Sequence, residues 1–175
     1  MTDTPTGRPA LDEDTIAFAG RVFQLARTGH APELEELLAA GLPANLLNDK
    51  GDSLLMLAAY HGHAEAVGAL MRHGGDATLA NDRGQVPLAA AAFKGYGRVI
   101  ETMLDAGAPV DGCGPDGKTA LMMAAMFDRT DVLGLLLARG ADAEARDAAG
   151  LTARELAERM GAVNTAARLA SRPGP

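Results

Sequence analysis

The sequence has no tryptophan, a single cysteine and few aromatic residues, with four Phe and two Tyr among 175 residues. A lone cysteine, Cys113, excludes an intrachain disulfide framework. The hydrophobic fraction is nevertheless 47%. A core must therefore be built from Ala, Leu, Val and Met, side chains that suit thin helices packed at short distances.

Long apolar runs and basic runs are also missing. No segment approaches the ~20 apolar residues that span a bilayer, and residues 1–10 contain no apolar stretch of the signal-peptide type. We therefore expect a soluble, cytoplasmic protein. Sixteen basic and 23 acidic residues give a net charge of −7. This balance disfavours nucleic acid and membrane partners, because both require a basic face.

What the sequence does contain is an internal repeat. Turn-type segments recur at residues 48–55, 81–88 and 114–121, with a weaker copy at 147–153, and each carries a glycine 33 residues from the next (Gly51, Gly84, Gly117, Gly150). Paired alanines (Ala58-Ala59, Ala91-Ala92, Ala124-Ala125) and a second glycine series (Gly41, Gly74, Gly107, Gly140) keep the same phase. A period of this size indicates stacked supersecondary units, and hence a binding surface rather than one catalytic cleft.

The local pattern within each unit is helical. Residues 11–15 supply cap residues and first-turn carboxylates for a helix that runs to about Arg27. Ile16, Ala19, Phe23 and Ala26 give this helix an apolar face at helical spacing. A second helix is expected near 32–40, and each later unit is expected to contain a glycine turn, a short helix such as 53–60, a tight link and a second helix ended by glycine.

These residues resemble the ankyrin repeat family. Its turn, alanine pair, Gly-His link and closing glycine match Gly51, Leu55, Ala58, Ala59, Gly62, His63, Leu70, Gly74 and Asp76. The resemblance implies an all-α solenoid of helix-turn-helix units with short β-hairpin-like turn loops. We expect a flexible tail at 1–10, one repeat domain at 11–170 (repeats at about 11–47, 48–80, 81–113, 114–146 and 147–170) and a second tail at 171–175. The first and last units are expected to act as caps.

The same resemblance implies a non-catalytic, monomeric module that binds a protein partner through a concave groove and the turn tips. The module is expected either to regulate or inhibit that partner or to serve as a passive scaffold. The 33-residue spacing assigns one pair of groove positions to each unit: Arg27-Thr28, Tyr60-His61, Phe93-Lys94, Met126-Phe127 and Arg159-Met160. From these and the tips, we predict that the partner-binding residues are Tyr60, His61, Phe93, Lys94, Met126, Phe127, Arg159, Lys50, Arg83 and Asp116. Aromatic side chains and Arg are enriched at interface hot spots. The alternative is that Tyr60, Phe93 and Phe127 pack over the seams between repeats and complete the core.

A second function class rests on residues 112–119, which match the phosphate-binding pattern G-x-x-x-x-G-K-T. Such a loop would define a nucleotide-binding enzyme, but it requires a buried strand before it and a long helix after it. The preceding residues 105–111 do not read as a strand. Gly117 and Thr119 are explained as the turn glycine and a helix cap, so we disfavour this alternative and expect Lys118 to lie exposed on a turn tip.

Other sites are poorly supported by the sequence. His61, His63 and His73 lack a carboxylate or cysteine at ligand spacing, so no metal site is expected. No nucleophile and base can be paired, because Cys113 has no phased histidine and Ser53 and Thr119 fit helix caps. We expect no catalytic residues and no cofactor.

Overall fold

The computed structural model describes residues 12–171, which form ten helices. They are α1 (Glu13–Thr28), α2 (Ala31–Ala39), α3 (Leu54–Tyr60), α4 (Ala64–Arg72), α5 (Pro87–Lys94), α6 (Gly97–Asp105), α7 (Ala120–Met126), α8 (Thr130–Ala138), α9 (Ala153–Met160) and α10 (Val163–Ala170). The predicted N-terminal tail lies outside the described residues, as do residues 172–175 of the C-terminal one. Ser171, assigned to that tail, is instead the C-cap residue of α10.

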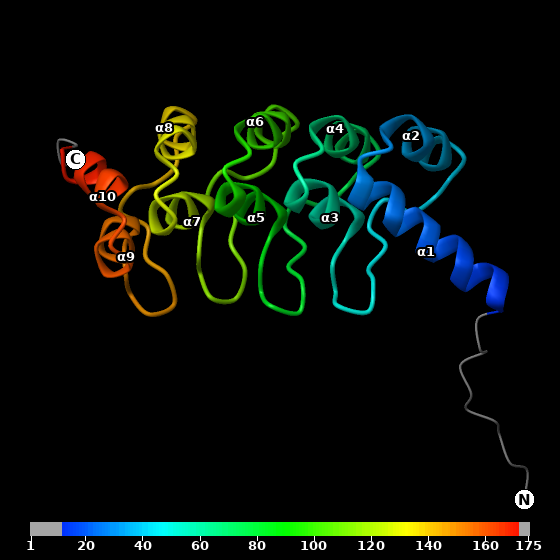
Figure 1. Ribbon diagram of the computed structural model, residues 1–175, viewed down its shortest axis with the longest axis horizontal. Helices are drawn as coiled ribbons and strands as arrows, with labels where there is room; N and C mark the ends of the chain where they lie inside the picture. Colours follow the sequence, from blue (N-terminus) through cyan, green and yellow to red (C-terminus); the bar gives the residue numbers. More distant parts are fainter. Residues whose placement is uncertain (1–11, 172–175) are drawn as a thin grey trace, which may run out of the picture.

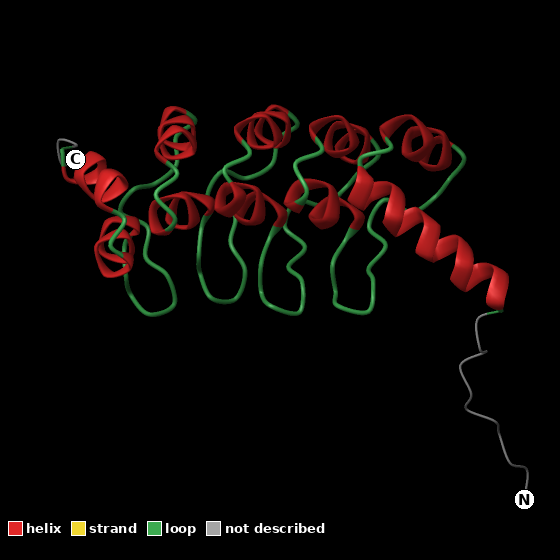
Figure 2. Cartoon of the chain, viewed as in Figure 1, coloured by secondary structure: helices red, strands yellow, loops and turns green. Residues whose placement is uncertain are grey.

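The helices form two rows that run along the molecule (Figure 1). An outer row contains α2, α4, α6 and α8, and an inner row contains α3, α5, α7 and α9, with turn loops projecting from the inner row. Helices and loops make up the described chain (Figure 2), and its one β-type pairing is an isolated antiparallel bridge between Leu47 and Ser53. The predicted all-α solenoid is confirmed.

Short helices of this kind depend on their caps. The hydroxyl oxygens of Ser53, Thr119 and Thr152 accept hydrogen bonds from backbone N–H groups at the starts of α3, α7 and α9. The outer helices end before glycines with φ between 84° and 100°, namely Gly41, Gly74, Gly107 and Gly140. This left-handed backbone carries little steric penalty for glycine, so the 33-residue glycine series fixes where each outer helix stops.

The core lies between the two rows and is dominated by small side chains. The paired alanines at 58–59, 91–92 and 124–125 are all fully buried. Because these alanines occupy the seams between α3, α5 and α7, the inner helices can approach closely. Leu55, Leu88 and Leu121, one each in α3, α5 and α7, belong to the same buried core.

The first helix departs from the sequence prediction. Ile16, expected on its apolar face, is 57% exposed, whereas Val22, Leu25 and Ala26 are buried. The reason is length: α1 has 16 residues against seven in α3, so its N-terminal half extends beyond the neighbouring helices (Figure 1). Among residues 12–171, no neighbouring helix covers the apolar side chain of Ile16 on that half.

Candidate functional site: the concave groove

The turn tips and the end of α3 enclose a hollow on the inner side of the stack. This cavity, of about 210 Å³, is lined by four of the predicted binding residues, Lys50, Arg83, Tyr60 and His61. Arg27 from α1 also lines it. The structure therefore brings turn-tip residues and groove residues from the first three units into one concave site.

The turn tips owe their shape to a repeated side-chain contact. Asn48 Oδ1 accepts hydrogen bonds from the backbone N–H groups of Lys50 and Asp52, both at 2.9 Å. Asn81 does the same in the next turn, for Arg83 and Gln85. The backbone N–H of Asp82 also donates to the carbonyl of Lys50, which ties the two tips together. Lys50 and Arg83 thus project from a fixed backbone.

Tyr60, His61 and Lys94 form one cluster in the groove. Tyr60 is 36% exposed, and the Lys94 ammonium lies 5.1 Å from the centroid of its ring. The His61 ring meets the Tyr60 ring edge-on, with 5.3 Å between centroids. A cation held over an aromatic face contributes attraction of about 0.5–1 kcal/mol at an exposed site, so this contact orders the Lys94 side chain between two units.

Phe93 and Phe127 form a second cluster one unit further along. Their rings meet edge-to-face with centroids 4.5 Å apart. Both side chains are half-buried, and neither belongs to the hydrophobic core among the described residues. The three groove aromatics are therefore not one continuous ring stack, because the contacts of Tyr60 are to His61 and Lys94 instead.

The remaining predicted residues lie apart from these two clusters. Met126 packs against the core, so its side chain is only partly available to a ligand. Arg159 is exposed at the end of α9. Asp116 lies on the third turn, where its carboxylate accepts the backbone N–H of Lys118 at 3.0 Å and pairs with the Lys118 ammonium at 3.3 Å.

Electrostatically, His61 stands out. Desolvation by its neighbours lowers the pKa of the His61 imidazole, and the charges of Arg27, His63 and Lys94 lower it further. His61 therefore favours its neutral form at pH 7. Arg27 occupies a predicted groove position but is not among the predicted binding residues. Arg27 lies 33 residues before Tyr60, and this repeat spacing is the sequence signal that could have identified it.

The P-loop-like segment has a different architecture from a phosphate-binding loop. No strand occurs within residues 106–119, all of which the structure describes, and the helix that follows has only seven residues. The Thr119 hydroxyl caps α7 by accepting the N–H of Met122. The prediction that Lys118 is exposed is wrong. Only 29% of its side chain is exposed, because its ammonium lies between the carboxylates of Asp116 and the buried Asp147.

Packing accounts for the glycines of this segment. A side chain on Gly114 would overlap the carbonyl oxygen of Gly84 in the preceding turn, and one on Gly112 would crowd Pro109. Gly114 stands at the repeat position that Asn48 and Asn81 occupy in the two preceding turns, so the third turn lacks their side-chain hydrogen-bond acceptor. Asp116, two residues later, supplies an acceptor oxygen instead.

The histidines have structural contacts. His63 donates from Nε2 to the carbonyl of Arg27 at 2.9 Å, which joins the second unit to α1. His73 Nε2 lies 2.7 Å from a carboxylate oxygen of Glu35. Within residues 12–171, no three His, Cys, Asp or Glu side chains are grouped so as to hold a metal ion.

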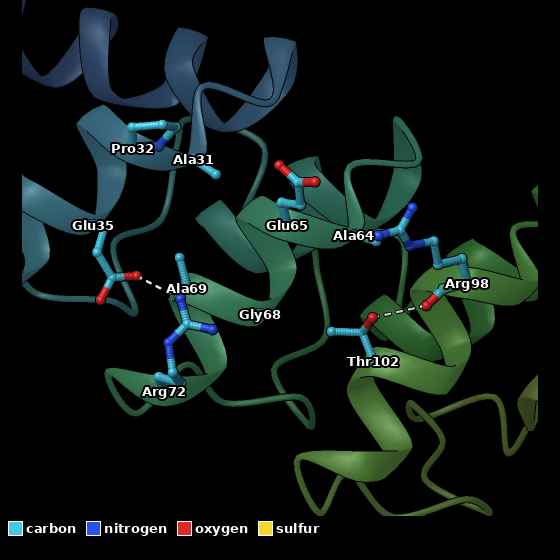
Figure 3. Close-up of a pocket in the computed structure, with 10 residues that line it drawn as sticks. All are labelled: Ala31, Pro32, Glu35, Ala64, Glu65, Gly68, Ala69, Arg72, Arg98 and Thr102. Carbon is cyan, nitrogen blue, oxygen red and sulfur yellow. Dashed lines mark hydrogen bonds and ion pairs between the residues drawn. The ribbon is translucent and has the colours of Figure 1, made fainter.

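A second hollow lies on the opposite side, over the outer helices (Figure 3). This cavity, of about 440 Å³, lies between α2, α4 and α6. Its floor is formed by small residues, including Ala31, Gly68 and Ala69, and Arg72 at its rim is paired with Glu35 at 2.7 Å. None of the described residues that line it is aromatic, unlike those of the inner site.

Comparison with known families agrees with this architecture. Residues 22–112 match the family described as "Ankyrin repeats (3 copies)", and residues 116–148 match "Ankyrin repeat". The first match alone covers more than half of the sequence, so the chain belongs to the ankyrin repeat family. Ankyrin repeats are generally non-catalytic modules for protein–protein interaction.

The chain is also similar to a putative ankyrin repeat protein of Pseudomonas aeruginosa. The two sequences are 59% identical over 61 residues, a match that spans 35% of this chain and 34% of that relative. Across residues 12–171, no helix has the length and apolar character needed to cross a membrane.

Proposed function

We propose that this chain is a non-catalytic interaction module that binds a partner protein along the inner groove and turn tips and thereby regulates it. The observation that carries this proposal is the Phe93–Phe127 pair. The two rings contact each other across neighbouring units, remain partly exposed and lie outside the core.

Ring pairs of this kind suit a binding surface. Aromatic side chains offer a large apolar area with few rotatable bonds, and they recur among the residues that contribute most to binding. Tyr60, half-exposed beside Lys94, offers a similar anchor one unit earlier. The turn tips, carrying Lys50 and Arg83, would set the orientation of the partner and its association rate.

The test separates binding from stability. The partner is captured from native lysate with wild-type protein, with Phe93→Ala as the control bait, then purified and titrated against each variant. Phe93→Ala and Phe127→Ala should weaken binding by about 1–3 kcal/mol, as expected for aromatic hot spots. Their melting temperatures should stay close to that of wild type.

Phe23→Ala supplies the matched control. Phe23 is a partly buried ring that packs against the core from α1, so its loss should lower the melting temperature and leave the affinity of the folded protein intact. If Phe93→Ala and Phe127→Ala behave like Phe23→Ala, the rings complete the core and the proposal is wrong. Regulation is then measured as the change in the partner's own activity on adding wild-type protein.

A further inference from the structure

The cations around the first groove units lack ionic partners. Arg27, Lys50, Arg83 and Lys94 have no carboxylate within 4.0 Å among residues 12–171. Other cations of the described chain, such as Arg72, Lys118 and Arg146, are paired with acidic side chains. Four unpaired cations are therefore gathered in one place on a protein whose net charge is −7.

The nearby carboxylates do not neutralise this cluster by direct contact. Asp52 is buried and binds the side-chain amides of Asn81 and Asn48, at 2.8 and 3.4 Å. Asp49 and Asp82 are exposed at the tips, whereas the charges of Arg27 and Lys94 act on His61 at the end of α3. The part of the site around His61 is thus positive, and the charges facing His61 from α1, from its own link and from α5 are Arg27, His63 and Lys94.

The distance between neighbouring units determines how far apart the contacting side chains of a bound segment must be along its chain. Packed helices lie about 8–10 Å apart, and an extended chain advances by roughly 3.3–3.6 Å per residue. About three residues of an extended segment therefore span one unit. Arg27 from α1 and Lys94 from α5 both face the second unit, Arg27 at His61 and Lys94 at the ring of Tyr60. A segment crossing the groove would therefore meet both cations at the second unit and, one unit or about three residues further along, the Phe93–Phe127 pair.

We propose that the occupant of the groove is an extended acidic segment of a partner protein, with two adjacent carboxylates and an apolar side chain about three residues away. This inference rests on the proposed function, because it describes what the same groove binds. The carboxylates lie against Arg27 and Lys94, and the apolar side chain lies on the rings of Phe93 and Phe127.

A random peptide display library is the probe, selected against the full chain and then titrated with the purified peptides. Enriched peptides should contain pairs of Asp or Glu with an apolar residue about three positions away. Lys94→Gln should weaken their binding about two- to fivefold, the effect of losing one exposed ion pair, and Arg27→Gln with Lys94→Gln should weaken it further. Arg98→Gln is the matched control, because Arg98 is exposed, lies on the outer side and loses the same charge.

The outcomes distinguish the two proposals. Peptides that lose binding in Phe93→Ala but carry no acidic excess, or that bind Lys94→Gln and wild type equally, would overturn the acidic-segment inference and leave groove binding intact. Peptides that are indifferent to Phe93→Ala, or a library that yields none, would count against groove binding itself.

Proton uptake provides an independent readout. A carboxylate placed beside His61 raises the pKa of its imidazole from the lowered value of the free protein, so binding takes up a proton. Affinity for the acidic peptides should therefore increase as the pH falls from 8 to 6, and His61→Gln should flatten this dependence. An affinity that is unchanged or falls over the same interval would contradict carboxylates at this position.

Discussion

The middle of the stack and its C-terminal end are held together by different kinds of contact. In the middle, α5 and α7 pack against each other, and both contribute fully buried alanines such as Ala91 and Ala124 to the core. At the C-terminal end, α10 is fixed by hydrogen bonds: the buried Thr165 hydroxyl donates to the carbonyl of Ala125 at 2.7 Å, and Asp128 accepts the backbone N–H of Thr165 at 2.9 Å.

This difference follows from what each part has on its far side. A middle unit is covered by apolar neighbours on both sides, so volume alone specifies its position. A terminal unit has one face in water, where no neighbouring unit covers an apolar side chain. Directional hydrogen bonds therefore fix the position of the terminal unit instead. Mutations that change volume should therefore act on the middle, and mutations or pH changes that remove hydrogen bonds should act on the end.

The largest expected effect is overpacking of the middle. Ala91→Leu adds a large side chain to a fully buried seam position, and should destabilise the fold by about 1–3 kcal/mol. Ala167→Leu, at an exposed position on α10, should have almost no effect. Urea unfolding of both variants measures this contrast, and an Ala91→Leu protein as stable as wild type would contradict the apolar seam.

A smaller effect is expected from removing one hydrogen bond at the end. Thr165→Val preserves the shape of a fully buried side chain while deleting its hydroxyl. The expected cost is about 1 kcal/mol, because the carbonyl of Ala125 keeps a second donor in the N–H of Asp128. Hydrogen exchange should locate the loosening in α10 and leave α5 and α7 protected. Equal loosening of all three helices would mean that the end is not an independent element.

These contacts mark how far the sequence alone can predict this molecule. The 33-residue glycine series correctly predicts the turns and helix ends, because a left-handed backbone favours glycine strongly. At the same 33-residue spacing, Asp128 stands where the other units have glycine, namely Gly29, Gly62, Gly95 and Gly161. Its backbone is also left-handed, with a φ of 55°. The sequence shows this substitution but not its reason, which is the contact with α10.

Other features depend on neighbours that the periodicity does not describe. The exposure of Ile16 follows from the length of α1 relative to the helices beside it. The partial burial of Lys118 follows from its position beside Asp147 of the next turn. Within the groove, phase alone brings Tyr60, Phe93 and Phe127 to successive units, but which rings touch depends on side-chain orientation.

The pH dependence of the two regions should also differ. Hydrogen bonds from the Thr165 backbone and the Asn164 side chain lower the pKa of the Asp128 carboxyl. A carboxyl with a lowered folded-state pKa adds stability above its unfolded pKa, and this contribution is lost as the pH falls through the folded value. Acidification below the usual range of aspartate, about 4, should therefore loosen α10 before the seam between α5 and α7.

Hydrogen exchange, corrected for the intrinsic pH dependence of amide exchange, measures this order. Asp128→Asn is the control, because asparagine tolerates the left-handed backbone and does not titrate. It should reduce the acid sensitivity of α10 relative to α5. If α10 in this variant still loosens over the same pH interval, another acid controls the end, and Glu155, whose pKa is lowered by the Thr152 backbone N–H, is then the next to replace.

The smallest effect is expected at Lys118, where the turn of the fourth unit meets the turn of the fifth. The ammonium of Lys118 pairs with Asp116 on its own turn and lies 3.8 Å from Asp147 on the next. Since Asp147 also accepts the backbone N–H groups of Ala149 and Leu151, it keeps partners when the lysine is removed. Lys118→Ala should therefore change stability by no more than ~0.5 kcal/mol.

The same variant decides the nucleotide alternative. A ligand that binds only the folded state must raise the melting temperature, so ATP or GTP with Mg²⁺ should leave the melting temperature of wild-type protein unchanged. The physical reason is that Lys118 is already occupied by two carboxylates and Thr119 by the start of α7, so neither is free for a phosphate or its metal. A saturable increase that disappears in Lys118→Ala would show that the turn opens to bind nucleotide and would replace the interaction module with an enzyme-like site.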